Sequence, residues 1–337
     1  MTNEAHATKI QEFDLLRALA IIILMFHHSQ IYGLTLLGFS LEGLTPYFEA
    51  ILLGIFFFIS GYFAERSFQK HNKGSISFFF SRMLRIYPPY LLAVFLYVNI
   101  LGITLKRNDL IIYLSGTHFI FAPNYAKPVI TIWYIGAIIL FYLIFGILLA
   151  HLRATKPLVI ASVLVFAAAY ALHQWTGLLD ERFFKYFIVF LAGILFARPS
   201  RYPSNWLSDK QALPKLALAL LATFIFSLTL DLGSTSPLYI FGVVFFILAW
   251  IVLLFALATK VKVPLLLKFA GIISYASYFA YLLHRPLWKL LADIFSVESG
   301  QDLILFRLFP ASILVFILSY YLQYGYDRLL AVFRRNG

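Results

Sequence analysis

Apolar stretches of about 20 residues recur along this chain, and only short polar segments separate them. A helix needs about that length to cross the hydrocarbon core of a bilayer. Hydrophobic residues make up 62% of the 337 residues and charged residues only 12%, and the mean hydropathy is +0.86. These values lie outside the range of soluble domains. The sequence therefore predicts an all-α, polytopic integral membrane protein that is embedded in a lipid bilayer.

Measured against this length, the chain divides into about ten spans. We expect them to form a single transmembrane domain over residues 1–337, without an appended soluble domain. The predicted spans are 13–32, 48–65, 87–105, 128–150, 157–173, 183–198, 213–231, 237–258, 267–291 and 303–324.

The basic residues indicate how these spans are oriented. The net charge is +12, but the 27 lysines and arginines are scattered through short loops rather than gathered on a soluble domain, so topology explains them better than nucleic-acid binding does. Most of them fall on the side of the N-terminus, which predicts that both termini are cytoplasmic and that the protein resides in the cytoplasmic membrane. The chain has no cysteine, which excludes disulfides, thiolate metal sites and a cysteine nucleophile, and we predict no metal site.

The first span carries polar side chains that are costly at membrane depth and therefore indicate function. On a helix, Arg17 and His28 lie about 20° apart on one face and roughly 16 Å apart along the axis, and Asp14 lies within about 60° of Arg17. Arg17 is near the cytoplasmic end and can extend its charge to the surface, whereas His28 is too deep to do so. His27 is about 80° from Arg17, so helical phase favours His28. A neutral imidazole there can act as a general base towards a hydroxyl or can itself attack an acyl group.

A basic pair precedes the third predicted span. Arg82 and Arg85 are three residues apart, so they project from one face of a helix. Two guanidiniums at this spacing suit bidentate contacts with phosphate, although arginines beside a membrane also serve as anchors to lipid headgroups. Pro88 and Pro89 follow, and they predict a break where the chain bends into the membrane.

Other polar residues are weaker candidates. His284 lies near the outer end of the ninth predicted span, where a lone histidine is more often an interfacial or structural group than a catalytic one. Trp133 opens the fourth span at the outer interface, where tryptophan is common, and Glu49 opens the second. We expect these three residues to contact substrate, with ordinary structural roles as the alternative. The Ser-Gly pair at 60–61 predicts close contact with another helix.

Taken together and in order, these motifs resemble the membrane-bound acyltransferase 3 family. The first span of that family carries Asp-x-Leu-Arg and a histidine eleven residues after the arginine, and an Arg-x-x-Arg pair precedes its third span. The resemblance covers nearly the whole chain. The matching positions are Asp14, Leu16, Arg17, His28, Arg82, Arg85, Tyr87, Pro88, the stretch 58–61, the pair 133–134 and the stretch 281–286.

The resemblance implies transfer of an acyl group, usually acetyl, from cytoplasmic acyl-CoA to a hydroxyl of a carbohydrate or glycolipid acceptor. It implies that His28 is catalytic, that Arg17 is its partner and that Asp14 orients Arg17. It also implies that Arg82 and Arg85 hold the phosphates of acetyl-CoA, which is a donor substrate rather than a permanently bound cofactor. Some members carry a second, extracytoplasmic domain that completes the transfer. We expect none here, which leaves direct transfer or a separate partner protein.

Two alternatives fit the same residues. A transporter of a lipid-linked glycan or an anionic solute would also place arginine and histidine at depth, although we find no internal repeat of the kind that marks many transporters. A sensor or scaffold without chemistry would leave His28 unexplained.

Overall fold

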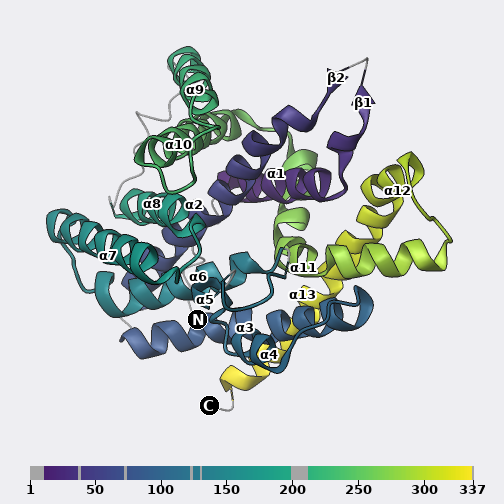
Figure 1. The fold of residues 1–337 in the computed structure, drawn as a ribbon, viewed down its shortest axis with the longest axis horizontal. Helices are drawn as coiled ribbons and strands as arrows, with labels where there is room; N and C mark the ends of the chain where they lie inside the picture. The colour runs from purple at the N-terminus through teal and green to yellow at the C-terminus, as the bar shows by residue number, and fades with distance from the viewer. Residues whose placement is uncertain are drawn as a thin grey trace, which may run out of the picture.

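The computed structural model describes residues 11–36, 39–71, 74–121, 124–129, 131–198 and 212–335, and helices make up most of them (Figure 1). Parts of both termini, on which the predicted orientation depends, lie outside these residues. The helices are α1 (Gln11–His28), α2 (Thr45–His71), α3 (Ser75–Ile100), α4 (Arg107–Leu114), α5 (His118–Phe121), α6 (Trp133–Ile144), α7 (Thr155–Thr176), α8 (Arg182–Ala197), α9 (Ala212–Ser227), α10 (Pro237–Lys260), α11 (Pro264–Ile294), α12 (Gln301–Phe306) and α13 (Ser312–Arg335). Two short strands, β1 (Thr35–Leu36) and β2 (Phe39–Ser40), pair antiparallel.

The helices confirm the prediction of a polytopic all-α membrane protein. Each of the ten predicted spans overlaps helical structure, and the last one, 303–324, runs from α12 into α13. Within the described residues, six helical stretches are long and apolar enough to cross a membrane, and two shorter apolar helices accompany them. The π-helical segments Phe145–Leu149 and Arg307–Ala311 extend α6 and connect α12 to α13. Helix α8 is absent from the six because it has only 16 residues, and α1 is absent because its 18 residues include the charged Glu12, Asp14 and Arg17.

Burial separates a central group of helices from a peripheral one. The most apolar part of α2 is 67% buried inside the protein, whereas that of α7 is only 11% buried. In Figure 1, α7 lies at one edge of the molecule and α12 at the other, with α1, α2 and α11 between them. The exposed apolar side chains of α7, such as Val163 and Leu164, suit a lipid environment.

Two hydrogen bonds join α1 to α11 at different depths. Ser274 Oγ donates to Asp14 Oδ1 at 2.8 Å, and His28 Nδ1 lies 2.8 Å from His284 Nε2. The bonded residues advance in the same chain direction on both helices, so α1 and α11 run parallel. Parallel packing agrees with their places as the first and ninth predicted spans, because an odd number of spans, seven, lies between them.

Helices α2 and α8 approach each other through a pair of glycines, as the Ser-Gly pair at 60–61 predicts. A Cβ atom on Gly61 would lie 2.0 Å from Phe190 O, and one on Gly193 would lie 2.1 Å from Phe58 O. Each glycine therefore meets the backbone of the other helix, where a side chain has no room. Small residues at such contacts let transmembrane helices pack closely by van der Waals attraction.

The predicted break at Pro88 and Pro89 is wrong. Helix α3 begins at Ser75, well before the predicted span, and it contains both prolines. Proline lacks the N–H that would bond to the carbonyl four residues earlier, so Pro88 leaves the Leu84 carbonyl without its helical donor. The hydroxyl of Tyr326, on α13, donates to that carbonyl. A tyrosine from a distant helix thus compensates for the proline.

We predict that Gly61→Ala destabilises the protein by about 1–3 kcal/mol, because the added methyl group must push α2 away from α8. Thermal unfolding in detergent measures the effect as a lower unfolding midpoint. Gly325→Ala on α13 is the matched control, because nothing lies within 4 Å of a Cβ atom added at Gly325. An unchanged midpoint for Gly61→Ala would contradict the close packing.

Candidate active site

The His28 imidazole is held by a second histidine. His284 is fully buried, and its Nδ1 lies 2.8 Å from Tyr281 O and 3.1 Å from Ala280 O. Carbonyl oxygens only accept hydrogen bonds, so Nδ1 of His284 carries a proton, and in the neutral ring Nε2 is left as an acceptor. The hydrogen bond between the two rings then requires His28 Nδ1 to donate. This assignment leaves His28 Nε2 with a free lone pair.

The pair of adjacent histidines is asymmetric. The rings of His28 and His284 are nearly parallel, with centroids 4.9 Å apart and planes within 10°, so the hydrogen bond joins them edge to edge. His27 packs between His28 and Tyr32, and its buried Nδ1 finds no hydrogen-bond partner in the described part of the chain. Of the two, only His28 is fixed to α11. The geometry therefore favours His28 over His27, as the position of His28 on the face of Arg17 also does.

His284 lies behind His28, where it bonds the His28 ring, and it is not among the residues that line the cavity on the other side of that ring. The contact with substrate expected of His284 stays a prediction, and the structure shows its buried ring in a hydrogen bond to His28. This hydrogen bond favours a positioning role.

A cavity of about 310 Å³, which we call the His28 cavity, opens beside His28. Glu49 and Trp133 both line it, as expected for residues that meet substrate. The Arg182 guanidinium lies 4.0 Å from the centroid of the Trp133 ring, so it covers one face of the indole. A sugar therefore cannot stack on that face.

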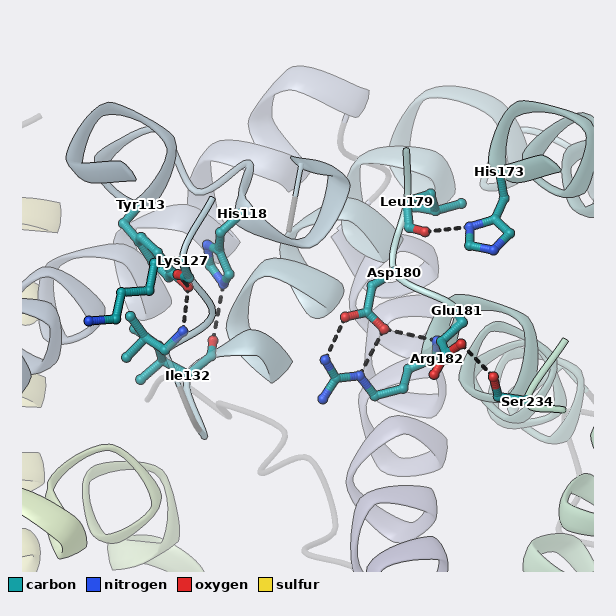
Figure 2. Close-up of polar contacts among 11 residues, drawn as sticks. Tyr113, His118, Lys127, Ile132, His173, Leu179, Asp180, Glu181, Arg182 and Ser234 are labelled. Carbon is teal, nitrogen blue, oxygen red and sulfur yellow. Dashed lines mark hydrogen bonds and ion pairs between the residues drawn. The ribbon is translucent and has the colours of Figure 1, made fainter. Parts of the chain in front are cut away.

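Part of the polar wall of the His28 cavity comes from His118 on α5 and from Asp180 and Arg182 at the start of α8 (Figure 2). Arg182 binds both oxygens of Asp180, with Nε at 2.8 Å from Oδ1 and Nη2 at 2.5 Å from Oδ2. Buried His118 is bonded through Nε2 to Ile132 O at 3.2 Å. Both residues are thus held by other parts of the protein and shape the wall rather than offering free charges.

A second cavity, of about 330 Å³, lies beside Arg17, Arg82 and Arg85, and we call it the Arg82 cavity. Arg82 Nη2 donates to Phe63 O at 2.7 Å. Its guanidinium also lies 5.5 Å and 5.4 Å from the ring centroids of Phe78 and Tyr142. The predicted pair on α3 therefore shares one cavity with the predicted arginine on α1.

Asp14 is placed differently from the expectation. It accepts the hydrogen bond from Ser274, and no hydrogen bond or ion pair joins it to Arg17 among the described residues. The Arg17 guanidinium instead lies 5.7 Å from the centroid of the Phe63 ring. The role of Asp14 in orienting Arg17 remains a prediction, and the structure shows Asp14 holding α11.

Tyr281 lines both cavities and stands between them. Its hydroxyl donates to Thr131 O, and its ring meets Tyr134 edge to face at a centroid distance of 5.4 Å. Arg17 lines only the Arg82 cavity and His28 only the His28 cavity. The polar stripe of α1 thus presents its arginine to one cavity and its histidine to the other, with Tyr281 between the two spaces.

The comparisons with known proteins agree with this arrangement. A search of curated proteins and one of solved structures found no match. A family model described as an acyltransferase domain, that of the acyltransferase 3 family, matches residues 10–324. That range includes α1, the His28 cavity, the His28–His284 pair and most of the residues that line the Arg82 cavity, and it covers nearly all of the chain. The chain therefore belongs to the acyltransferase 3 family and is a multi-pass membrane acyltransferase.

Proposed function

We propose that this acyltransferase moves an acetyl group from cytoplasmic acetyl-CoA to a hydroxyl of a carbohydrate or glycolipid. The observation that carries the proposal is the free Nε2 of His28. Its hydrogen bond to His284 leaves that nitrogen unprotonated, and the nitrogen belongs to a residue that lines a cavity. An unprotonated imidazole nitrogen is what acyl transfer to a hydroxyl requires, either as a base or as a nucleophile.

In the proposal, the donor occupies the Arg82 cavity. Coenzyme A is anionic through its phosphates, and guanidinium groups bind phosphate oxygens in bidentate geometry. Arg17, Arg82 and Arg85 supply three such groups to one cavity. The predicted orientation places the loop between α2 and α3 in the cytoplasm, where the donor is made, and the His28 cavity then faces the opposite side of the membrane.

The reaction needs the His28 Nε2 lone pair in either of two routes. As a base, Nε2 removes the proton of the acceptor hydroxyl while the hydroxyl oxygen bonds to the thioester carbonyl carbon. The carbon–sulfur bond then breaks, and the leaving thiolate takes the proton back from Nε2. As a nucleophile, Nε2 bonds to the acetyl carbon first and the thiolate leaves, and the acceptor oxygen then displaces the imidazole while its proton passes to the thiolate. Both routes require the acetyl group to pass Tyr281.

For the donor site, we predict that Arg85→Ala weakens acetyl-CoA binding by roughly 10- to 100-fold, the value of a charge-assisted hydrogen bond of about 1.5–3 kcal/mol. Arg82→Ala should weaken binding and also lower the unfolding midpoint, because Arg82 holds the Phe63 carbonyl. Calorimetric titration of the purified protein in detergent measures the affinity. Lys70→Ala, an exposed change outside the cavity, is the control. Unchanged affinity in both arginine variants would place the donor elsewhere.

For the reacting histidine, we predict that His28→Ala binds acetyl-CoA like the parent protein but lowers transfer by about 10²- to 10⁴-fold, the range for a lost general base. Mass spectrometry of acetylated glycans from cells that carry each variant detects the loss. His27→Ala is the neighbouring comparison and should retain the larger part of the transfer. Should His27→Ala abolish transfer while His28→Ala preserves it, the assignment moves by one residue.

For the second histidine, we predict that His284→Phe reduces transfer strongly, because His28 then loses the acceptor that fixes its tautomer. His284→Gln should restore part of the activity, since its side-chain oxygen can accept from His28 Nδ1. The rate of transfer at saturating acetyl-CoA, measured for both variants, separates this role from a merely structural one. Equal losses in the two variants, with equal unfolding midpoints, would contradict it.

A further inference from the structure

Arg285, which directly follows His284 on α11, lines the His28 cavity. Its Nε is buried and has no hydrogen-bond partner. Within the described part of the chain, no carboxylate lies within ion-pair distance of its guanidinium, and no carbonyl accepts from it. The cavity beside His28 therefore contains a positive charge that none of the described residues pairs.

The surroundings of Arg285 differ from those of the other arginine in the same cavity. Arg182 is bonded to both oxygens of Asp180. The ionisable groups that act on Arg285 are instead the phenols of Tyr32, Tyr97 and Tyr281, which are neutral at physiological pH. Neutral phenols do not neutralise the positive charge of the Arg285 guanidinium, so that charge can attract an anionic ligand.

Glu49 is a carboxylate that lines the same cavity, but it does not pair the charge of Arg285. Its charge acts on His27, Arg182 and Tyr186, and it is not among the groups that act on Arg285. A further arginine, Arg307, is close enough to Arg285 to act on it electrostatically, and it also lacks an ion pair in the described residues. The region around Arg285 is therefore positive.

A buried charge without a partner is unfavourable, and the favoured partner of a guanidinium is an oxyanion that it can bind through two parallel hydrogen bonds. Other orphaned polar atoms line the same cavity, among them Thr131 Oγ1 and His27 Nδ1. A ligand that satisfies all of them bears an anionic group together with several hydroxyls. At about 310 Å³, the cavity is at the small end of ligand pockets, so it accommodates a small part of a glycan.

We propose that the acceptor is an acidic sugar and that Arg285 binds its carboxylate or phosphate ester in the His28 cavity. This inference rests on the proposed acetyl transfer and names the class of its acceptor. Binding of the anionic group at Arg285 brings a hydroxyl of the same sugar into the cavity that His28 lines. His284 and Arg285 are adjacent in the chain. In the proposal, His284 orients the reacting imidazole of His28 and Arg285 holds the acceptor.

The test uses three probes that differ only at carbon 6 of the sugar: methyl glucoside, methyl glucuronide and methyl glucoside 6-phosphate. The full-length protein in lipid nanodiscs is given acetyl-CoA and each probe, and binding and acetyl-CoA consumption are measured. We expect at least one acidic probe to half-saturate the protein at roughly 10- to 100-fold lower concentration than the neutral one, the gain expected from a charge-assisted pair. The better of the two acidic probes identifies the anion as carboxylate or phosphate.

The variants assign that preference to a residue. Arg285→Gln should remove the preference, so that the acidic probes half-saturate the protein at about the same concentration as methyl glucoside. Arg285→Lys should keep part of the preference, because it retains the charge without the bidentate geometry. Arg107→Gln is the control, because Arg107 is exposed at the start of α4 and does not line the cavity. Unfolding midpoints show whether each variant folds.

Two outcomes would overturn the inference. The first is equal affinity of the parent protein for the acidic and the neutral probes. The other is a loss in Arg285→Gln that is the same for all three probes, which would mean that Arg285 acts on the reacting atoms and not on the acid group. The proposed function fails separately, if acetyl-CoA is neither bound nor consumed with any probe. Binding and consumption of acetyl-CoA without acid preference would overturn only the acidic acceptor.

Discussion

The hydrogen bond between His28 and His284 is the interaction on which the candidate site depends. It joins residues 256 positions apart in the chain, and it assigns the proton of each ring. Two carbonyls of α11 fix the proton of His284, His284 fixes that of His28, and the free nitrogen of His28 results. The chemistry of α1 is therefore determined by the backbone of another helix. Without that helix, a histidine on α1 would sample both tautomers, and only one of them has Nε2 unprotonated.

The division of the site into two cavities gives each substrate its own space. The arginines proposed to bind the donor phosphates line one cavity and the imidazole lines the other, with Tyr281 between them. Such a partition suits an enzyme whose donor and acceptor are present on different sides of a membrane, because neither substrate has to cross. Only the acetyl group, which is small and uncharged, has to pass the tyrosine.

The sequence predicts most of the helices, because a membrane span leaves an apolar stretch of known length. It also predicts that Arg17 and His28 share a helical face, and that Arg82 and Arg85 do, because such spacing is local. It misses contacts made by residues far apart in the chain. Nothing near Pro88 indicates that Tyr326 will bond to the carbonyl of Leu84, so a break is predicted where a helix continues.

The role of His284 is missed for the same reason. A lone histidine late in the chain shows no partner in the sequence, and the ring of His28 is that partner. Asp180 likewise precedes its helix as an ordinary polar residue, although it holds the arginine that covers Trp133. To predict such pairs, one must know which helices pack against each other. The sequence pattern of a single helix does not show its neighbours.

The polar stripe of α1 also has a consequence for how the protein is made. Helix α1 leaves the ribosome first, but Ser274 and His284, which bond its Asp14 and His28, lie on α11 and are synthesised some 250 residues later. Until then, the imidazole of His28, which is too deep to reach the surface as Arg17 can, lacks its partner on α11. The His28–His284 pair, and with it the candidate site, therefore forms only after α11 has been made.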